Sequence, residues 1–316
     1  MKIRIGIVGY GNLGKAVEQN ILSSSKYKLV AIFSRRMVSS KFGTRVEPYE
    51  HHRFYKNKID IMFLCGGSLK DTEYQTEEIA RRFDCINSFD THSKITSHIS
   101  SLEKICKETH HRAIVSCGWD PGLFSIMRAY FYKISGNIPH TFWGKGISMG
   151  HSDAIRQVDG VDDGVQFTIP NKEAVLLAKK NRLDDEIPKH YRECYVVSKA
   201  KNKSKIVEQI KNIPNYFSGY PTSVTFVDEV KLAKLKNKMI HGGEVISAFN
   251  KVNNKFSMSF KTKMSSNPDF TAKIMTCYIQ AIISLKEKSM TGAFTPLDIP
   301  VSMLFEDRFK MVDKFC

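Results

Sequence analysis

The amino-acid sequence predicts an α/β protein in which a doubly wound parallel sheet is followed by a second, α+β domain with a mixed or antiparallel sheet. Three observations predict this fold class. The 316 residues are enough for about two domains. Short apolar runs alternate with helical patterns over residues 1–120, and longer strand-like runs follow over 121–267. Helices within 268–316 are expected to pack near the first domain.

Five apolar runs rich in β-branched residues predict the strands of the first domain. They cover residues 2–8, 29–33, 60–65, 85–88 and 113–115. Apolar residues at helical spacing predict a helix that begins near Leu13 and helices over about 72–83 and 94–108. Such alternation implies parallel strands joined by crossover helices, and the right-handed crossover rule makes a doubly wound sheet the expected topology.

The pattern changes after residue 121, where predicted strands become longer and more frequent. Strands are expected around 140–148, 164–169, 193–198, 222–230, 244–249 and 255–263, and helices near 171–181 and 204–213. A last helix is predicted over 268–287, because Phe270, Ile274, Tyr278 and Leu285 fall on one of its faces. This second part is therefore expected to form its own sheet.

The composition excludes several classes of protein. Apolar residues make up 42 % and charged residues 25 %, which excludes a disordered or fibrous chain. No apolar run is long enough for a membrane span, so we expect no membrane partner. The seven scattered cysteines include no C-x-x-C, so we expect no metal site and a reducing, cytoplasmic location. The net charge of +16 is typical of proteins that bind polyanions, but no aromatic residues interleave with the lysines of 199–205. A solvated basic surface without a nucleic-acid partner is expected.

The first strand runs directly into Gly9-Tyr10-Gly11-Asn12-Leu13-Gly14, and a helix follows. This is the context that a dinucleotide-binding G-x-G-x-x-G motif requires. Gly9 allows a tight turn, Gly11 lets the backbone approach a pyrophosphate, and Gly14 lets the helix pack close to the strand. The N–H groups at the start of the helix then bind phosphate. The motif predicts a Rossmann-type, dinucleotide-binding domain over residues 1–120; the alternative is a glycine-rich turn without a ligand.

The end of the second predicted strand favours NADP over NAD. In NAD-binding domains an acidic residue about 20 residues beyond the loop binds the adenine ribose. Here that position is Ser34, and Arg35 and Arg36 follow it. A hydroxyl group and two guanidinium groups suit a 2′-phosphate, which arginine can bind through two parallel hydrogen bonds. The alternative is that the two arginines cap an exposed strand end.

Polar residues also follow three other predicted strands of the first domain. The segments are Cys65-Gly66-Gly67-Ser68, Ser88-Phe89-Asp90-Thr91-His92 and Ser116-Cys117-Gly118-Trp119-Asp120-Pro121-Gly122. Ligands of such sheets bind at the carboxyl ends of the strands. Asp90 and Asp120 are therefore expected beside the nicotinamide, where a carboxylate can bind an ammonium group or accept a proton. Turn formation and helix capping are the alternative for an Asp before Pro-Gly.

The second domain offers separate candidates. They are Trp143, the segment Met149-Gly150-His151-Ser152-Asp153, Thr168, Arg192, His241 and Asn267. Each also has an ordinary structural explanation. Trp143 is typical of a core strand, and His241 is typical of a turn or a hydrogen-bonded core histidine. Arg192 is expected at a helix–strand junction, and its ordinary explanation is a surface pair beside Glu193.

Eight segments together resemble the meso-diaminopimelate dehydrogenase family. They are GYGNLG (9–14), FSRR (33–36), GWDPG (118–122), TFWG (141–144), GHSDA (150–154), HGG (241–243), NPDFTA (267–272) and GAFT (292–295). The resemblance covers nearly the whole chain, and GWDPG with GHSDA is much more specific than the glycine loop. It implies a cytoplasmic, homodimeric, NADP-dependent oxidoreductase that reversibly oxidises the D-centre of meso-2,6-diaminopimelate. The products would be L-2-amino-6-oxopimelate, which cyclises to tetrahydrodipicolinate, ammonia and NADPH, in lysine and peptidoglycan-precursor biosynthesis.

The resemblance also implies roles for individual residues. The loop from Gly9 to Gly14 would hold the pyrophosphate, Ser34 to Arg36 the 2′-phosphate, and Cys65 to Ser68 with Ser88 to Asp90 would line the cofactor. Cys117, Gly118, Trp119, Asp120 and Pro121 would lie where nicotinamide and substrate meet. Asp90 and Asp120 would be catalytic, Trp119, Trp143, Met149 and Gly150 would shape the reacting end, and Thr168, Arg192, His241 and Asn267 would bind the distal L-centre. Cys117 and Gly66 stand where the family commonly has Thr and Met. The residues 121–267 would form the substrate-binding and dimerisation domain.

Two other functions stay open at this point. An NADP-binding redox sensor would bind the dinucleotide without releasing ammonia. Another NADP-dependent reductase of the same architecture would need a lysine or histidine pair near the chemistry and a substrate without the second amino-acid centre. Turnover with meso-diaminopimelate distinguishes both from the family function.

Overall fold

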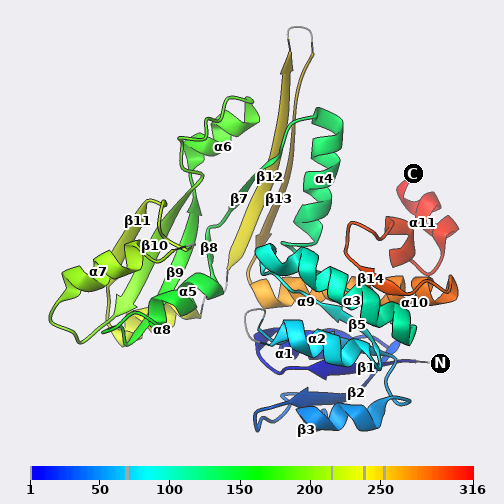
Figure 1. The fold of residues 1–316 in the computed structure, drawn as a ribbon. Coiled ribbons are helices and arrows are strands. Elements are labelled where there is room, and N and C mark those ends of the chain that lie inside the picture. Colours follow the sequence, from blue (N-terminus) through cyan, green and yellow to red (C-terminus); the bar gives the residue numbers. More distant parts are fainter. Residues whose placement is uncertain (1, 68–70, 215, 238–239, 252–253) are drawn as a thin grey trace. The chain divides into compact units, whose positions relative to one another are not determined.

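The computed structural model describes residues 2–67, 71–214, 216–237, 240–251 and 254–316. The chain divides into two compact units. Unit 1 comprises Met1–Ile126 and Pro268–Cys316, and unit 2 comprises Met127–Asn267. In Figure 1, unit 1 combines the blue and cyan start of the chain with its orange and red end. No helix among the described residues is both long and apolar enough to cross a membrane.

Unit 1 contains a seven-stranded sheet in the order β14-β6-β5-β4-β1-β2-β3. All neighbouring strands are parallel. The strands are β1 (Ile3–Val8), β2 (Tyr27–Ser34), β3 (Val46–Pro48), β4 (Ile61–Leu64), β5 (Asp84–Asn87), β6 (Arg112–Ile114) and β14 (Gly292–Phe294). The chain proceeds from β1 to β2 and β3 on one side and to β4, β5 and β6 on the other. The predicted doubly wound parallel sheet is thereby confirmed, and β1 is its switch point.

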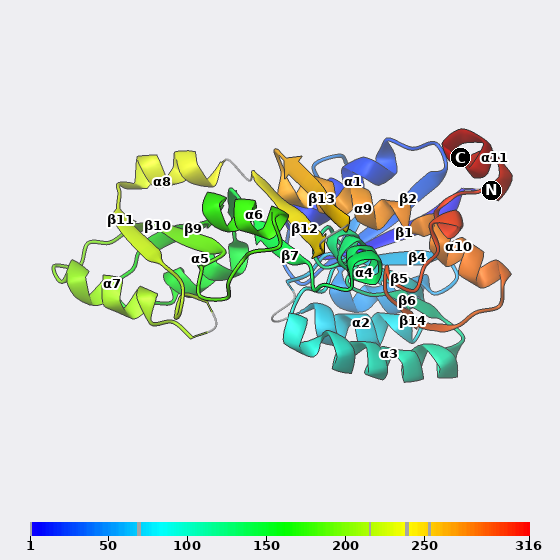
Figure 2. The same cartoon turned by 90° about the horizontal axis from the view of Figure 1, so that it is seen from above.

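Helices cover both faces of this sheet, as Figure 2 shows. One face packs against α1 (Asn12–Leu22), α9 (Asn267–Cys277) and α10 (Ile279–Glu287), and the other against α2 (Thr72–Ala80) and α3 (Ile95–Thr109). Alternation along β1 explains this, because Ile5 and Ile7 point to the first face and Val8 to the second. The single helix predicted over 268–287 is wrong in one respect: it is divided at Tyr278. The short helices η1 (Tyr49–Tyr55), η2 (His92–Lys94), η3 (Val301–Leu304) and α11 (Arg308–Phe315) complete the unit.

Unit 2 contains two sheets. A mixed sheet has the order β11-β10-β9-β8, and an antiparallel sheet has the order β13-β12-β7. The strands are β7 (His140–Trp143), β8 (Gly146–Ile147), β9 (Asp163–Pro170), β10 (His190–Val197), β11 (Thr222–Phe226), β12 (His241–Lys251) and β13 (Asn254–Met264). The helices are α4 (Leu123–Ser135), which begins in unit 1, α5 (Met149–Arg156), α6 (Lys172–Lys179), α7 (Lys203–Lys211) and α8 (Glu229–Lys236). The hairpin of β12 and β13 is the longest strand pair in Figure 1.

Two strands predicted for this region are wrong in extent. The strand expected over 140–148 is divided after Trp143, because Gly144 has a φ of +113° and turns the chain from one sheet into the other. The strand expected over 222–230 ends at Phe226, and α8 follows. The carboxylate of Asp228 accepts a hydrogen bond from the Lys231 N–H at 2.6 Å and so caps this helix.

Candidate functional site

The glycine loop joins β1 to α1 at the switch point of the sheet. Gly9 has a φ of +89°, and a Cβ at Gly14 would lie only 2.2 Å from the Gly9 carbonyl oxygen. Gly11 is the N-cap of α1 and provides no side-chain cap, and, apart from its chain neighbours, no described atom lies within 4 Å of the position that its Cβ would take. The start of α1 is therefore open to an anion, which its N–H groups and helix dipole attract. This geometry fits the pyrophosphate of a dinucleotide.

The Tyr10 side chain is directed into unit 1. Its hydroxyl donates a hydrogen bond to the fully buried Glu18 and accepts one from the Lys41 N–H at 2.8 Å. Ser40 donates to the other oxygen of Glu18 at 2.6 Å. Burial and the Glu18 contact raise the pKa of Tyr10, so the hydroxyl stays a donor. The ring thus fixes the glycine loop to residues 40–44 and leaves only the Tyr10 backbone for a ligand.

The end of β2 lies beside this loop, because the Gly9 N–H donates to the Phe33 carbonyl at 2.9 Å. Ser34 is buried, and its Oγ accepts a hydrogen bond from the Arg36 N–H at 3.1 Å. Arg35 and Arg36 are exposed. Arg35 forms an ion pair with Asp71, whereas Arg36 has no carboxylate within ion-pair distance in the described part of the chain. Two guanidinium groups beside a hydroxyl fit a 2′-phosphate.

The segment after β4 also contacts the glycine loop. The Cys65 N–H donates to the Val8 carbonyl at 2.7 Å, and a Cβ on Gly9 would lie 3.0 Å from the Gly66 nitrogen. Thr72 donates its hydroxyl to the Gly66 carbonyl at 2.9 Å, which fixes this segment to α2. Burial raises the pKa of the Cys65 thiol, so this sulfur is not a thiolate at neutral pH. The predicted cofactor residue Ser68 lies outside the described residues.

Asn87 holds the ends of β5 and β6 together, and the sequence did not single it out. Its carbonyl accepts a hydrogen bond from the Cys117 N–H at 2.8 Å, and its side-chain oxygen accepts from Phe89 and Ser116 N–H groups. Its amide donates to Thr76 of α2 at 3.0 Å. The only sequence signal is a polar residue that ends an apolar strand. Asn87 fixes the backbone from which Ser88 to Asp90 and Cys117 to Pro121 extend.

The two predicted catalytic carboxylates follow these neighbouring strands. Asp90 follows the buried Phe89 and is exposed, whereas Asp120 is half-buried between the buried Trp119 and Pro121. The Gly118 N–H donates to the Pro121 carbonyl at 3.1 Å, which closes the turn that carries Trp119 and Asp120. Both aspartates thus lie at the carboxyl edge of the sheet, as predicted, and the edge also carries the glycine loop.

In unit 2, the alternative explanation for Arg192, a surface pair at a helix–strand junction, is wrong. Arg192 lies in the centre of the mixed sheet, directly opposite Thr168 in the pairing of β10 with β9, and is only 7 % exposed. Its Nη1 donates to the Thr168 hydroxyl at 2.7 Å, and its guanidinium lies 4.4 Å from the centre of the Tyr220 ring. Its Nε has no hydrogen-bond partner, and no described carboxylate forms an ion pair with it. Burial lowers the pKa of Arg192, but the group remains a cation.

Such an arrangement is costly unless a ligand supplies the missing charge. A buried guanidinium without a carboxylate partner has lost its hydration without an ionic replacement. A ligand carboxylate at this position could accept two parallel hydrogen bonds from the guanidinium. The buried Gln166 supports the arrangement, because its amide donates to the Thr168 hydroxyl at 3.2 Å. Arg192 and Thr168 therefore form a candidate anion site.

Two histidines beside this anion site are neutral. The His190 Nε2 accepts a hydrogen bond from the Trp143 N–H at 2.8 Å, and the two rings stack with centroids 5.2 Å apart. Burial, with the Arg192 charge as a smaller cause, lowers the pKa of His190 to about 3 and that of His151 to about 4. His151 pairs with the Ser148 hydroxyl at 2.7 Å. Arg192 is thus the permanent positive charge of this group, and Trp143 has its orientation set by His190.

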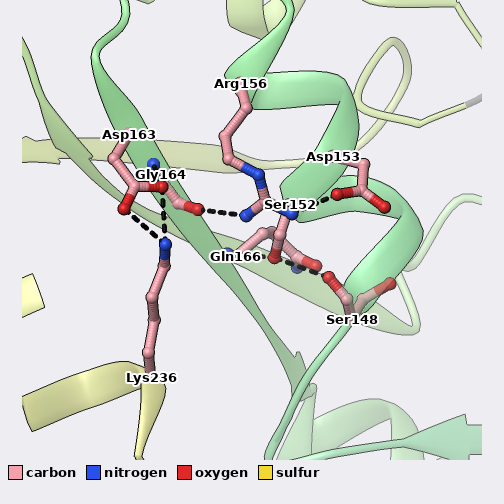
Figure 3. Close-up of polar contacts among 8 residues, drawn as sticks. All are labelled: Ser148, Ser152, Asp153, Arg156, Asp163, Gly164, Gln166 and Lys236. Atoms are coloured by element: carbon pink, nitrogen blue, oxygen red, sulfur yellow. Dashed lines mark hydrogen bonds and ion pairs between the residues drawn. The ribbon is translucent and has the colours of Figure 1, made fainter. Parts of the chain in front are cut away.

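Figure 3 shows the polar contacts that join α5 to β9. Ser152 donates to the Ser148 carbonyl at 2.6 Å and accepts from the Gln166 N–H at 3.0 Å. Arg156 donates to the Gly164 carbonyl at 2.8 Å and pairs with Asp153, while Lys236 of α8 pairs with Asp163. These contacts fix the position of α5 on β9, and Met149 and Gly150 are the first two residues of that helix. Met149 is about half exposed.

His241 and Asn267 complete the predicted set. His241 is the buried first residue of β12, and a Cβ at Gly146 would lie 2.5 Å from its ring. Gly146 pairs with Thr168, and Thr168 pairs with Arg192, so these three residues form one row across β8, β9 and β10. The His241 ring lies beside the Gly146 end of this row. Asn267 begins α9, where unit 2 ends. Among the described residues, no group of three or more His, Cys, Asp and Glu side chains could hold a metal ion.

The depressed histidine pKa values make the stability of the protein sensitive to acid. Below pH 6.5 the unfolded chain binds a proton at His190, whereas the folded chain does not, so unfolding becomes easier as the pH falls. From pH 6.5 to 5, His190 alone should cost about 1.5 kcal/mol of unfolding free energy. We expect His190→Gln, which can still accept the Trp143 N–H, to lose correspondingly less stability over this range in urea titrations. Parallel losses in both proteins would show that His190 is protonated in the folded state.

Comparison with known proteins agrees with this geometry. A family model described as the diaminopimelic acid dehydrogenase C-terminal domain matches residues 118–266. A meso-diaminopimelate D-dehydrogenase of Ureibacillus thermosphaericus is 41 % identical over 312 residues, which cover 96 % of this chain and 95 % of the relative. A solved structure of Corynebacterium glutamicum DAP dehydrogenase in complex with DAP has a TM-score of 0.93, 34 % identity and 99 % coverage of both chains. An engineered D-amino acid dehydrogenase bound to NADP⁺ has a TM-score of 0.89 and 33 % identity, and the match covers 100 % of this chain and 99 % of that chain. This chain therefore belongs to the meso-diaminopimelate D-dehydrogenase family.

Proposed function

We propose that this protein is an NADP-dependent enzyme that oxidatively deaminates the D-centre of meso-2,6-diaminopimelate. The products are L-2-amino-6-oxopimelate, which cyclises to tetrahydrodipicolinate, ammonia and NADPH, and the reaction is reversible. The observation that carries the substrate assignment is the buried Arg192, because its Nε has no hydrogen-bond partner and no described carboxylate pairs with its guanidinium, which calls for an anionic group on the substrate. Relatives that are 36–41 % identical carry this enzyme name, which supports the assignment.

Unit 1 supplies the cofactor-binding residues in this proposal. The backbone of Tyr10, Gly11, Asn12 and Leu13 binds the pyrophosphate at the start of α1, and Ser34, Arg35 and Arg36 bind the 2′-phosphate. Cys65 to Ser68, Ser88 to Asp90 and Cys117 to Pro121 line the rest of the dinucleotide. Bound NADP supplies the hydride acceptor, and the protein supplies orientation and charge. The openness of the loop around Gly11 and the absence of an acidic residue at Ser34 support NADP.

Unit 2 supplies the residues that recognise the distal L-centre. Arg192 and Thr168 bind its carboxylate, and His241, together with Asn267, offers hydrogen bonds to the remaining polar atoms. Recognition of the distal end matters because the substrate has two amino-acid centres of opposite configuration. Only a site that fixes one end can present the Cα hydrogen of the other, D-configured, end for transfer.

Asp90 and Asp120 act at the reacting D-centre, and Trp119, Trp143, Met149 and Gly150 shape its surroundings. The two carboxylates bind the substrate ammonium. The Cα hydrogen leaves as a hydride and the ammonium loses one proton, which leaves an iminium. Water then adds to the iminium carbon while Asp120 accepts a proton from that water. Asp120 returns this proton to the nitrogen, the C–N bond breaks to release ammonia, and the hydroxyl group loses its proton to solvent and becomes the oxo group. We assign the base to Asp120 because it is more shielded from solvent than Asp90.

Formation of NADPH on addition of meso-diaminopimelate and NADP tests this function. We expect turnover with the meso isomer and NADP, at least tenfold lower kcat/KM with NAD, and little or none with the LL isomer. The DD isomer and D-lysine test how strictly the distal L-centre is read. Binding of NADPH without turnover of any of these amino acids would reject the dehydrogenase and favour the redox sensor.

We also propose that the enzyme is a cytoplasmic homodimer, as the family resemblance implies. Exposed apolar side chains on and after α4 support a contact with a second copy. They include Tyr130, Tyr132, Ile134 and Ile138, which are between 51 % and 80 % exposed. Burial of such side chains favours association. No nucleic-acid or membrane partner is part of the proposal.

A further inference from the structure

We propose that Asp71 and Tyr74, at the start of α2, are positioning residues that orient Arg35 toward the 2′-phosphate of NADP. Through Arg35 they contribute to the preference of the enzyme for NADP over NAD. This inference rests on the proposed NADP-dependent function and adds to it residues that do not themselves contact the phosphate.

Both terminal nitrogens of the Arg35 guanidinium have a partner on or next to α2. Its Nη2 forms an ion pair with the Asp71 carboxylate at 2.5 Å, and its Nη1 donates to the Tyr74 hydroxyl at 2.9 Å. A guanidinium carries five N–H groups, so these two contacts leave others for a phosphate. Without them the side chain would be free to move, because about half of its surface is exposed. Arg36, its neighbour, has no such carboxylate partner among the described residues.

The Asp71 carboxylate pairs with Arg35 and does not cap α2. An Asp at the N-cap normally accepts a hydrogen bond from a backbone N–H of the first turn. Asp71 occupies the N-cap of α2 but makes no such bond. Its backbone is nevertheless fixed, because its N–H donates to the Gly67 carbonyl at 2.9 Å and its carbonyl accepts from the Gln75 N–H. The carboxylate thus stands on a fixed backbone and faces Arg35.

Orientation before binding favours the 2′-phosphate. A free arginine side chain loses rotamer freedom when it binds, and that loss weakens the complex. Asp71 and Tyr74 remove much of this freedom in advance. The negative charge of Asp71 opposes a phosphate only weakly, since Arg35 already neutralises it at contact distance. NAD has a hydroxyl group in place of the 2′-phosphate and does not need the Arg35 guanidinium. Its affinity should therefore not depend on Asp71 and Tyr74.

Calorimetric titration of the enzyme with NADP and with NAD, in the absence of amino-acid substrate, tests the inference. We expect Asp71→Asn to raise the Kd for NADP about fivefold, in keeping with a strong surface ion pair, and Tyr74→Phe about twofold. The Kd for NAD should stay within about twofold of wild type in both variants. Glu73→Gln is the matched control: it removes an equal charge from the same turn of α2, but Glu73 pairs with Lys94 and not with Arg35.

Each outcome has a distinct meaning. Equal weakening of NADP and NAD in Asp71→Asn would mean that Asp71 only supports the local fold, and tighter NADP binding would mean that it competes with the phosphate; both results overturn the inference. If Asp71→Asn unfolds, Tyr74→Phe still decides through the ratio of the two Kd values. A wild-type enzyme that binds NAD as tightly as NADP would instead contradict the proposed cofactor.

Discussion

Replacement of Arg192 by Met is expected to lower kcat/KM for meso-diaminopimelate by about 10²–10³-fold. The reason is that Arg192 is buried, and its guanidinium is the cation proposed to pair with the distal carboxylate of the substrate. The same substitution should raise the thermal stability. A buried guanidinium with an unpartnered Nε costs free energy in the ligand-free protein, and Met fills similar space without a charge. Activity and stability should thus change in opposite directions.

Steady-state kinetics and thermal unfolding of the same preparations measure both effects. Arg182→Met is the control, because Arg182 is an exposed arginine of the same unit. D-norleucine, which lacks the distal carboxylate and amine, provides a second comparison: its turnover should change far less than that of meso-diaminopimelate. A loss below tenfold with the natural substrate would mean that Arg192 does not bind its carboxylate.

Asp120→Asn is expected to lower kcat by about 10²–10³-fold, which is within the range of general acid–base catalysis, and to change KM by only a few-fold. Asparagine keeps the size and hydrogen bonds of the side chain but cannot accept the proton of the attacking water. Asp120 is half-buried between Trp119 and Pro121, so bulk water is a poor substitute for it. Asp90→Asn should act chiefly on KM, because the exposed Asp90 is expected to bind the ammonium.

The comparison of the two variants separates binding from catalysis. Rates of NADPH formation at saturating and limiting substrate give kcat and KM, and melting temperatures exclude unfolding as the cause. If Asp120→Asn lowers kcat by no more than about tenfold while KM rises, Asp120 binds substrate and another group activates the water.

The architecture of unit 1 could be predicted from local sequence patterns. Runs of β-branched residues predicted most of its strands. The segment from Gly9 to Gly14 predicted the position of the switch point, because a strand, a glycine-rich turn and a helix follow one another there without a gap. Strand β14 could not be found in this way. Its three residues, Gly292–Phe294, form a strand only because β6 lies beside them, and β6 is some 180 residues earlier in the chain.

The burial and the contact partners of individual site residues were harder to predict than the helices and strands that carry them. For Arg192, a surface pair beside Glu193 was the ordinary alternative to a role in substrate binding. Its burial results from the pairing of β10 with β9 on one side and β11 on the other, which no local pattern reveals. The ion pair of Arg35 with Asp71 likewise joins residues from β2 and α2. The cap of α8 was different, since Asp228 before a helical stretch is a signal that the sequence does contain.

The division of unit 1 into two segments has a consequence for synthesis on the ribosome. Helices α9 and α10 provide Ala272, Met275, Ile279 and Ile282 to the core beneath the glycine loop, and this core cannot close before they emerge. At about 5–20 residues per second, the 190 residues from Met127 to Cys316 take roughly ten to forty seconds to translate. The contiguous unit 2 can fold during this interval while the first 126 residues still expose one face of their sheet. Nascent chains of this enzyme are therefore expected to be clients of ribosome-associated chaperones.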